Sequence, residues 1–132
     1  LESIKMTPLL QRVKRLQATA LSARDAFKMA TIEGAKALGV NKELGSLEVG
    51  KKADFVVLNG NSPVLANIHD PFQAIVYCAG KREVREVWVE GEIVLKDGDV
   101  LNVSLGEVVE RSRELALKLV ESAGLSKLSS LF

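Results

Sequence analysis

The sequence predicts an α+β fold, with helices toward both ends of the chain and short strands between them. Apolar residues recur at helical spacing up to residue 39, and the same spacing returns from residue 104. Between residues 40 and 100 the period of the apolar residues shortens toward two, as in strands. Turn signals such as Asp97-Gly98 separate the apolar runs of this middle block.

Residues 1–39 predict two helices. The first helix starts or bends at Pro8, because proline is tolerated in a first turn and disrupts a helix interior. Its apolar positions form an amphipathic pattern: Ile4, Leu9, Val13 and Leu16. Ser22 stands three residues before Asp25, as in a capping box, and predicts the start of the second helix. This second helix, rich in Ala and Gly, is expected to end at Gly39 in a left-handed conformation.

Residues 40–100 predict about four short strands. The expected strands cover residues 53–59, 74–79, 84–89 and 93–95. Glu90-Gly91 predicts a two-residue turn between the last two strands, and Asp97-Gly98 predicts another after them.

A third helix is predicted near the end of the chain. Ser104 and Glu107 have the spacing of a capping box, and an amphipathic pattern then continues to Gly124. The last segment, residues 125–132, is an apolar and serine-containing tail without a clear pattern.

Composition limits the classes of function. The chain has 132 residues, of which 47% are apolar and 27% charged, and this excludes a disordered tail. The formal net charge of +1 gives no field that would gather nucleic acid or an anionic membrane, so neither is an expected partner. The apolar runs are far too short to cross a bilayer. A single cysteine excludes an internal disulfide and fits a reducing, cytoplasmic location.

The sequence offers no metal site. His69 is the only histidine and Cys78 the only cysteine, and their spacing matches no zinc-binding pattern. Cys78 lies in an apolar run that predicts a strand, so we expect a buried, unreactive thiol. No Gly-x-Ser-x-Gly sequence is present to anchor a serine hydrolase.

The sequence contains no phosphate-binding loop, and its paired carboxylates do not indicate an acid–base site. Gly50-Lys51-Lys52 lacks the upstream glycine and the Ser or Thr of a P-loop, and a solvated turn is the simpler interpretation of the two lysines. The pairs Asp97 and Asp99, and Glu90 and Glu92, each flank a turn glycine. We therefore assign no catalytic, cofactor-binding or metal-binding residue to the chain.

Two segments carry a recognisable pattern. Residues 29–39 read A-T-x-x-G-A-x-A-L-G after Met29, and residues 45–58 read G-S-L-x-x-G-K-x-A-D followed by an apolar run. Together they closely resemble the C-terminal region of the metal-dependent amidohydrolase superfamily. His69-Asp70-Pro71, Ile75-Val76-Tyr77 and residues 84–91 resemble the branch with methylthioadenosine/S-adenosylhomocysteine deaminases, cytosine and guanine deaminases and triazine chlorohydrolases.

The resemblance implies a (β/α)₈ barrel beside a small β-sandwich. On this basis residues 1–39 are helices from the end of the barrel, 40–100 the C-terminal part of the sandwich, and 101–132 a closing helix and tail. The family holds a divalent metal, of the zinc or iron class, with a His-x-His pair, further histidines and an aspartate. Such a metal lowers the pKa of a bound water. None of those motif positions is present in this sequence.

The expected function is therefore that of a non-catalytic C-terminal portion. The full-length enzyme would hydrolytically deaminate, or dechlorinate, an aminated purine, pyrimidine or related ring. We expect this chain alone to be inactive and to require the missing barrel portion or a homo-oligomer partner. Leu1 in place of an initiator Met fits a truncated or processed product, and no signal peptide is recognised. Two alternatives remain, a subunit that completes a split hydrolase and a stand-alone, self-associating structural module.

The absence of metal ligands predicts that a chelator or added Zn²⁺ leaves the melting temperature of the chain unchanged. A ligand that binds the folded state raises its stability, so a binding site would reveal itself as a shift. Thermal unfolding with EDTA, and with Zn²⁺ in excess, measures this directly. A metal-dependent shift would contradict the assignment.

Overall fold

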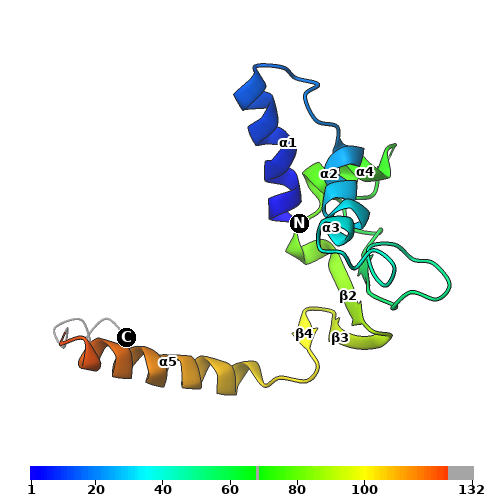
Figure 1. Ribbon diagram of the computed structural model, residues 1–132. Helices are drawn as coiled ribbons and strands as arrows, with labels where there is room; N and C mark the ends of the chain where they lie inside the picture. Colours follow the sequence, from blue (N-terminus) through cyan, green and yellow to red (C-terminus); the bar gives the residue numbers. More distant parts are fainter. Residues whose placement is uncertain (68, 125–132) are drawn as a thin grey trace. The chain divides into compact units, whose positions relative to one another are not determined.

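The computed structural model describes residues 1–67 and 69–124, and the chain divides into two compact units, residues 1–99 and a second unit that begins at Val100 (Figure 1). The first unit contains helices α1 (Glu2–Arg15), α2 (Ala23–Met29), α3 (Ile32–Ala37) and α4 (Pro71–Gln73), the π-helix η1 (Ala74–Cys78), the 3₁₀-helix η2 (Lys81–Glu83), and strands β1 (Phe55–Leu58), β2 (Val84–Val89) and β3 (Glu92–Lys96). Strand β4 (Asp99–Val100) and helix α5 (Leu105–Ser122) follow. The predicted mixture of helix and strand is confirmed.

Helix α1 begins at Glu2, so the prediction of a start at Pro8 is wrong. Pro8 lies inside the helix and is fully buried. The helix ends at Arg15 and is capped by Leu16, which has a left-handed backbone (φ 50°) and donates its N–H to Val13 O at 3.3 Å. Side-chain contacts with α2 and η1, rather than helical propensity alone, hold this helix in place.

The predicted second helix is two helices, with a break at Ala30 and Thr31. Ser22 caps α2 as predicted, since its Oγ accepts a hydrogen bond from Asp25 N at 3.1 Å. At the break, Thr31 Oγ1 donates back to Phe27 O at 2.9 Å and so competes with the helical backbone. Gly34 faces the same corner, where a Cβ would lie only 2.8 Å from Met29 O. The left-handed conformation predicted for Gly39 is confirmed (φ 74°).

The sheet has the strand order β1-β2-β3-β4. Strand β1 pairs antiparallel with β2, and Phe55 stacks on its cross-strand partner Trp88 with ring centroids 5.4 Å apart. Strands β2 and β3 form the predicted hairpin, in which Glu90 and Gly91 both have positive φ. Such a turn matches the twist of the two strands it joins.

The strand predicted over residues 74–79 is wrong, because this run forms η1. Asp70 starts the helical path by accepting hydrogen bonds from Phe72 N at 2.9 Å and Gln73 N at 3.4 Å. Ala79 N then donates to Ala74 O at 2.8 Å, which closes a five-residue turn. A short apolar run is compatible with either a strand or a buried helix, and the cap at Asp70 decides between them here. The fourth strand is β4 instead.

The buried residues of the first unit form two clusters, and η1 belongs to both. Ala23 and Ala26 of α2 pack with Val76 of η1 in the first cluster, and Phe27 and Phe72 meet edge to face at its margin. The second cluster contains Leu65 with Ala74 and Ala79, and Leu58 of β1 packs against it. Because η1 contributes to both clusters, it connects the helices to the sheet.

Helix α5 begins and ends close to the predicted residues. Ser104 Oγ accepts a hydrogen bond from Glu107 N at 3.4 Å, and Gly124 has a left-handed backbone (φ 69°). The predicted tail, residues 125–132, lies outside the described residues. Among the helices that the structure describes, none combines the length and apolarity needed to cross a membrane.

Gly45 and Gly50 offer a matched test of the packing around α3. Both have φ of 92°, so alanine costs about 1–2 kcal/mol of backbone strain at either position. At Gly45 the added Cβ would also lie 2.7 Å from the Cβ of Ala35 and 2.9 Å from Ile32 Cα, whereas at Gly50 nothing lies within 4 Å. We expect Gly45→Ala to lower the free energy of unfolding by about 1–3 kcal/mol more than Gly50→Ala, measured by urea denaturation. Equal losses would contradict the packing described here.

Candidate functional site

The two side chains best suited to bind a metal lie apart from any cluster of ligands. Within residues 1–67 and 69–124, no group of three or more His, Cys, Asp or Glu side chains is placed to hold a metal ion. His69 is exposed, and Cys78 is also exposed, at the last residue of η1. The expectation of a buried Cys78 in a strand is therefore wrong, because η1 turns this residue outward. The donors in the described chain do not fit the divalent metal that the resemblance implies.

A buried carboxylate organises the loop between β1 and β2. Glu83 accepts hydrogen bonds from Gly80 N at 2.8 Å and from Ser62 Oγ at 3.1 Å, and its backbone carbonyl accepts one from Asn59 N at 2.7 Å. The hydrogen bond from Gly80 N, followed by that from Ser62, holds the pKa of Glu83 below its usual value. Sequence analysis missed this cluster, because Ser62 and Glu83 are 21 residues apart and match no local motif.

The Gly-Lys-x-Ala-Asp segment binds the hairpin turn. Asp54 Oδ1 accepts a hydrogen bond from Glu90 N at 2.7 Å, and Ala53 O accepts one from Gly91 N at 3.1 Å. The Lys52 ammonium group donates to the Glu90 carboxylate, and this hydrogen bond raises the pKa of Lys52. These contacts fix the start of β1 against the turn of β2 and β3.

Lys51, whose side chain is largely covered, belongs to a second network in the same segment and lies 3.3 Å from the Glu48 carboxylate. Its Nζ donates to Ser46 Oγ at 2.6 Å, and Ser46 Oγ donates to the Glu48 carboxylate. The hydrogen bond from Ser46, together with Lys51, lowers the pKa of Glu48. Lys51 and Lys52 therefore both pair with carboxylates of the chain itself, and their contacts are those of a structural turn.

Helix α1 leaves its apolar side chains on the surface. Its inner side contributes Ile4 and Pro8 to the packing with α2 and η1. The opposite side carries what we call the α1 stripe, spaced as one face of a helix: Met6, Leu9, Leu10 and Val13. Leu10 is 58% exposed and Val13 72% exposed. The predicted pattern joined Ile4 with Leu9 and Val13 in one face, whereas the structure places them on different sides.

The α1 stripe is an exposed apolar surface of the kind that interaction sites use. Helix α1, which carries the stripe, contacts α2, and the two helices can be located in Figure 1.

Comparison with known proteins bears on what this surface is for. Residues 1–94 match the sequence pattern of the amidohydrolase family, described as "Amidohydrolase family". The chain belongs to the amidohydrolase family. The resemblance seen in residues 29–58 is confirmed, and the match extends from α1 through most of β3.

Relatives of this amidohydrolase chain are deaminases. It is 37% identical over 122 residues to 5'-deoxyadenosine deaminase of Methanopyrus kandleri, and 37% identical over 121 residues to 5-methylthioadenosine/S-adenosylhomocysteine deaminase of Desulforudis audaxviator. Each alignment covers 92% of this chain and 28% of the relative. The chain thus spans little more than a quarter of the length of these curated relatives.

A solved structure gives the same picture. An adenosine deaminase from Xanthomonas campestris with bound zinc superposes with a TM-score of 0.79 and 30% sequence identity. The superposition covers 84% of this chain and 25% of that protein. The arrangement of helices and sheet in this chain is therefore one found within a larger zinc-bound enzyme.

The lowered pKa of Glu83 predicts a pH dependence of stability. A carboxyl group with a lower pKa in the folded state stabilises the fold above its usual pKa of about 4.5, and this contribution is lost as the pH falls through the folded-state value. We expect Glu83→Gln to destabilise the chain at pH 7 and to flatten the loss of stability below pH 4.5, measured by urea denaturation between pH 3 and 7. Glu92→Gln, at an exposed position of β3, controls for the change in net charge. Identical pH profiles for the two variants would contradict this role of Glu83.

Proposed function

We propose that this chain is the non-catalytic C-terminal portion of a metal-dependent amidohydrolase that deaminates an aminated purine of the adenosine type. Its residues 1–39 would cover the end of a (β/α)₈ barrel, and residues 40–100 would complete a small β-sandwich. The deaminase relatives, of which the chain spans little more than a quarter, support this assignment.

The α1 stripe is the observation that carries the proposal. Burial of apolar surface is worth roughly 25 cal/mol per Å², so a helix gains by burying such a stripe against another layer. In a barrel enzyme each outer helix packs its apolar side on the strands within. The stripe on α1 has this form, while the inner side of the same helix already packs on α2 and η1.

The overall reaction would be hydrolysis, in which water replaces the ring amino group and ammonia leaves. The metal of such enzymes lowers the pKa of the attacking water. Since the described residues provide no ligand set, the metal and its ligands would belong to the rest of the enzyme. The part played by this chain is to support the barrel from outside, and alone it would be inactive.

A chimera tests the proposal. The aligned 122 residues of the Methanopyrus kandleri deaminase are replaced by the matching residues of this chain. We expect the chimera to bind zinc and to deaminate 5'-deoxyadenosine, because the α1 stripe would meet the barrel of the relative. Zinc content, the melting temperature and ammonia release are measured.

Leu10→Asp is the decisive variant, with Lys5→Asp at an exposed position of the same helix as its control. In this chain alone, both should change the free energy of unfolding by no more than about 0.5 kcal/mol, because both positions are exposed. In the chimera, Leu10→Asp would bury an unpaired carboxylate, so we expect loss of the folded, zinc-bound enzyme. If Leu10→Asp and Lys5→Asp behave alike in the chimera, the stripe does not dock on the barrel.

A further inference from the structure

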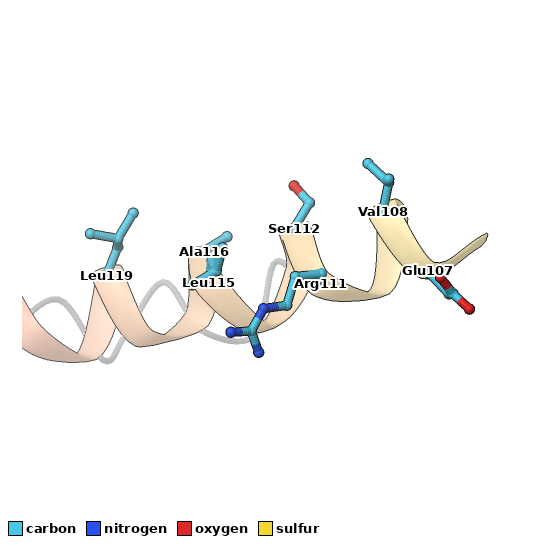
Figure 2. A pocket seen from close by; sticks show the side chains of 7 residues that line it. All are labelled: Glu107, Val108, Arg111, Ser112, Leu115, Ala116 and Leu119. Atoms are coloured by element: carbon cyan, nitrogen blue, oxygen red, sulfur yellow. The ribbon is translucent and has the colours of Figure 1, made fainter. Parts of the chain in front are cut away.

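Helix α5 and the turn after β1 carry surface features that no site above has used. The groove on α5 is lined by residues of that helix alone, and Figure 2 shows Val108, Ser112 and Leu119 projecting from one side of it. The turn after β1 differs from this groove, because it joins a side-chain amide to a backbone nitrogen that can react with it. These two groups belong to Asn59 and Gly60.

The turn over residues 59–62 is anchored to the Glu83 cluster. Asn59 N donates to Glu83 O at 2.7 Å, and Ser62 N donates to Asn59 O at 3.1 Å, as in a β-turn. Ser62 Oγ also binds the Glu83 carboxylate, at 3.1 Å. Asn59 and Gly60 are nevertheless exposed to solvent, so water and hydroxide reach them.

The side chain of Asn59 folds back along the turn. Its Oδ1 accepts a hydrogen bond from Asn61 N at 3.1 Å, which makes an Asx turn and directs the amide toward the peptide group that follows Asn59. Gly60 N donates to no acceptor within residues 1–67 and 69–124. A Cβ added at Gly60 would meet nothing within 4 Å apart from its chain neighbours. The nitrogen beside the amide is therefore unbonded and uncrowded.

Two features stabilise the anion that forms when this nitrogen attacks the amide. Negative charge would develop on Asn59 Oδ1, which already accepts a hydrogen bond from Asn61 N. Asn59 also lines a groove whose charged side chains are mostly basic, and their net positive charge acts in the same direction. The charged residues of this groove are Lys81, Arg82, Arg85 and Asp97.

We propose that Asn59 is a site of spontaneous deamidation in the folded chain, and that the turn selects it over Asn61. Hydroxide takes the proton from Gly60 N, and the nitrogen forms a bond to Asn59 Cγ. The bond between Cγ and the amide nitrogen then breaks, and that nitrogen takes a proton from water and leaves as ammonia. Water opens the resulting cyclic imide at either carbonyl and leaves aspartate or isoaspartate at position 59. In balance, one water enters and one ammonia leaves.

Asn61 provides a comparison within the same turn. Its side chain is exposed, as that of Asn59 is, but the nitrogen that follows it is held differently. Ser62 N donates to Asn59 O at 3.1 Å, and Ser62 is buried. This nitrogen would have to leave its hydrogen bond before it could attack, so we expect Asn61 to keep its amide while Asn59 loses its own.

Isoaspartate at position 59 would weaken the anchored turn. The main chain then runs through the former side chain and gains a methylene, and the carbonyl that accepted the hydrogen bond from Ser62 N becomes part of a free carboxylate. We expect the aged chain to melt at a lower temperature than freshly prepared Asn59→Asp, which gains the same charge without a longer backbone. Equal melting temperatures would contradict this consequence.

Peptide mapping by mass spectrometry tests the proposal on the whole chain. The folded chain and the same chain unfolded in guanidinium chloride are incubated at pH 8, and the loss of each amide is followed with time. We expect the ratio of the rates at Asn59 and Asn61 to be severalfold higher in the folded chain than in the unfolded one. Gly60→Ala should slow the reaction at Asn59 roughly tenfold, because the added Cβ crowds the attacking nitrogen.

Three results would overturn the proposal. Retention of the Asn59 amide in the folded chain, while the unfolded chain reacts, would show that the fold protects it. An equal ratio in both states would mean that the turn selects nothing. An unchanged rate in Gly60→Ala would exclude attack by the backbone nitrogen. The inference does not depend on the proposed enzyme, because neither the α1 stripe nor a barrel takes part in it.

Discussion

The π-turn of η1 is the interaction on which the first unit of this chain depends. Its five residues place Val76 in the helical cluster, and Ala74 beside Leu58 and Leu65 in the cluster at the sheet. A hydrogen bond from Ala79 N to Ala74 O spans five residues, one more than in an α-helix, and so closes a wider turn. If this segment ran as an extended strand, alternate side chains would leave one cluster or the other. η1 links the helices to the sheet because it supplies residues to both clusters.

The residues that carry the family resemblance hold this framework together. Thr31 and Gly34 make the corner between α2 and α3, and Asp54 binds the hairpin turn through Glu90 N. At Thr31 and Asp54 a side chain bonds a backbone atom, and at Gly34 the absence of a side chain admits one. Part of the sequence pattern that identifies the family therefore records how this segment folds.

Local signals predicted most of the fold. Ser22 and Ser104 marked helix starts, and Glu90-Gly91 and Asp97-Gly98 marked the turns of the sheet, because caps and turns depend on neighbouring residues. The strand predicted for residues 74–79 and the apolar face predicted for α1 were wrong, because tertiary contacts determine both features. An apolar run fits a strand or a buried helix equally well, and periodicity does not reveal which side of α1 meets α2. The Glu83 cluster joins residues distant in sequence, so no local pattern indicates it.

The central claim is that this chain supports an amidohydrolase barrel, and the coding DNA upstream of Leu1 tests it most directly. The 122 aligned residues are 28% of the Methanopyrus kandleri relative, which is therefore about 440 residues long. The account predicts a reading frame that continues upstream for about 300 codons and encodes a His-x-His pair. A stop codon directly before the codon for Leu1 would contradict it, and the chain would then be a separately encoded protein.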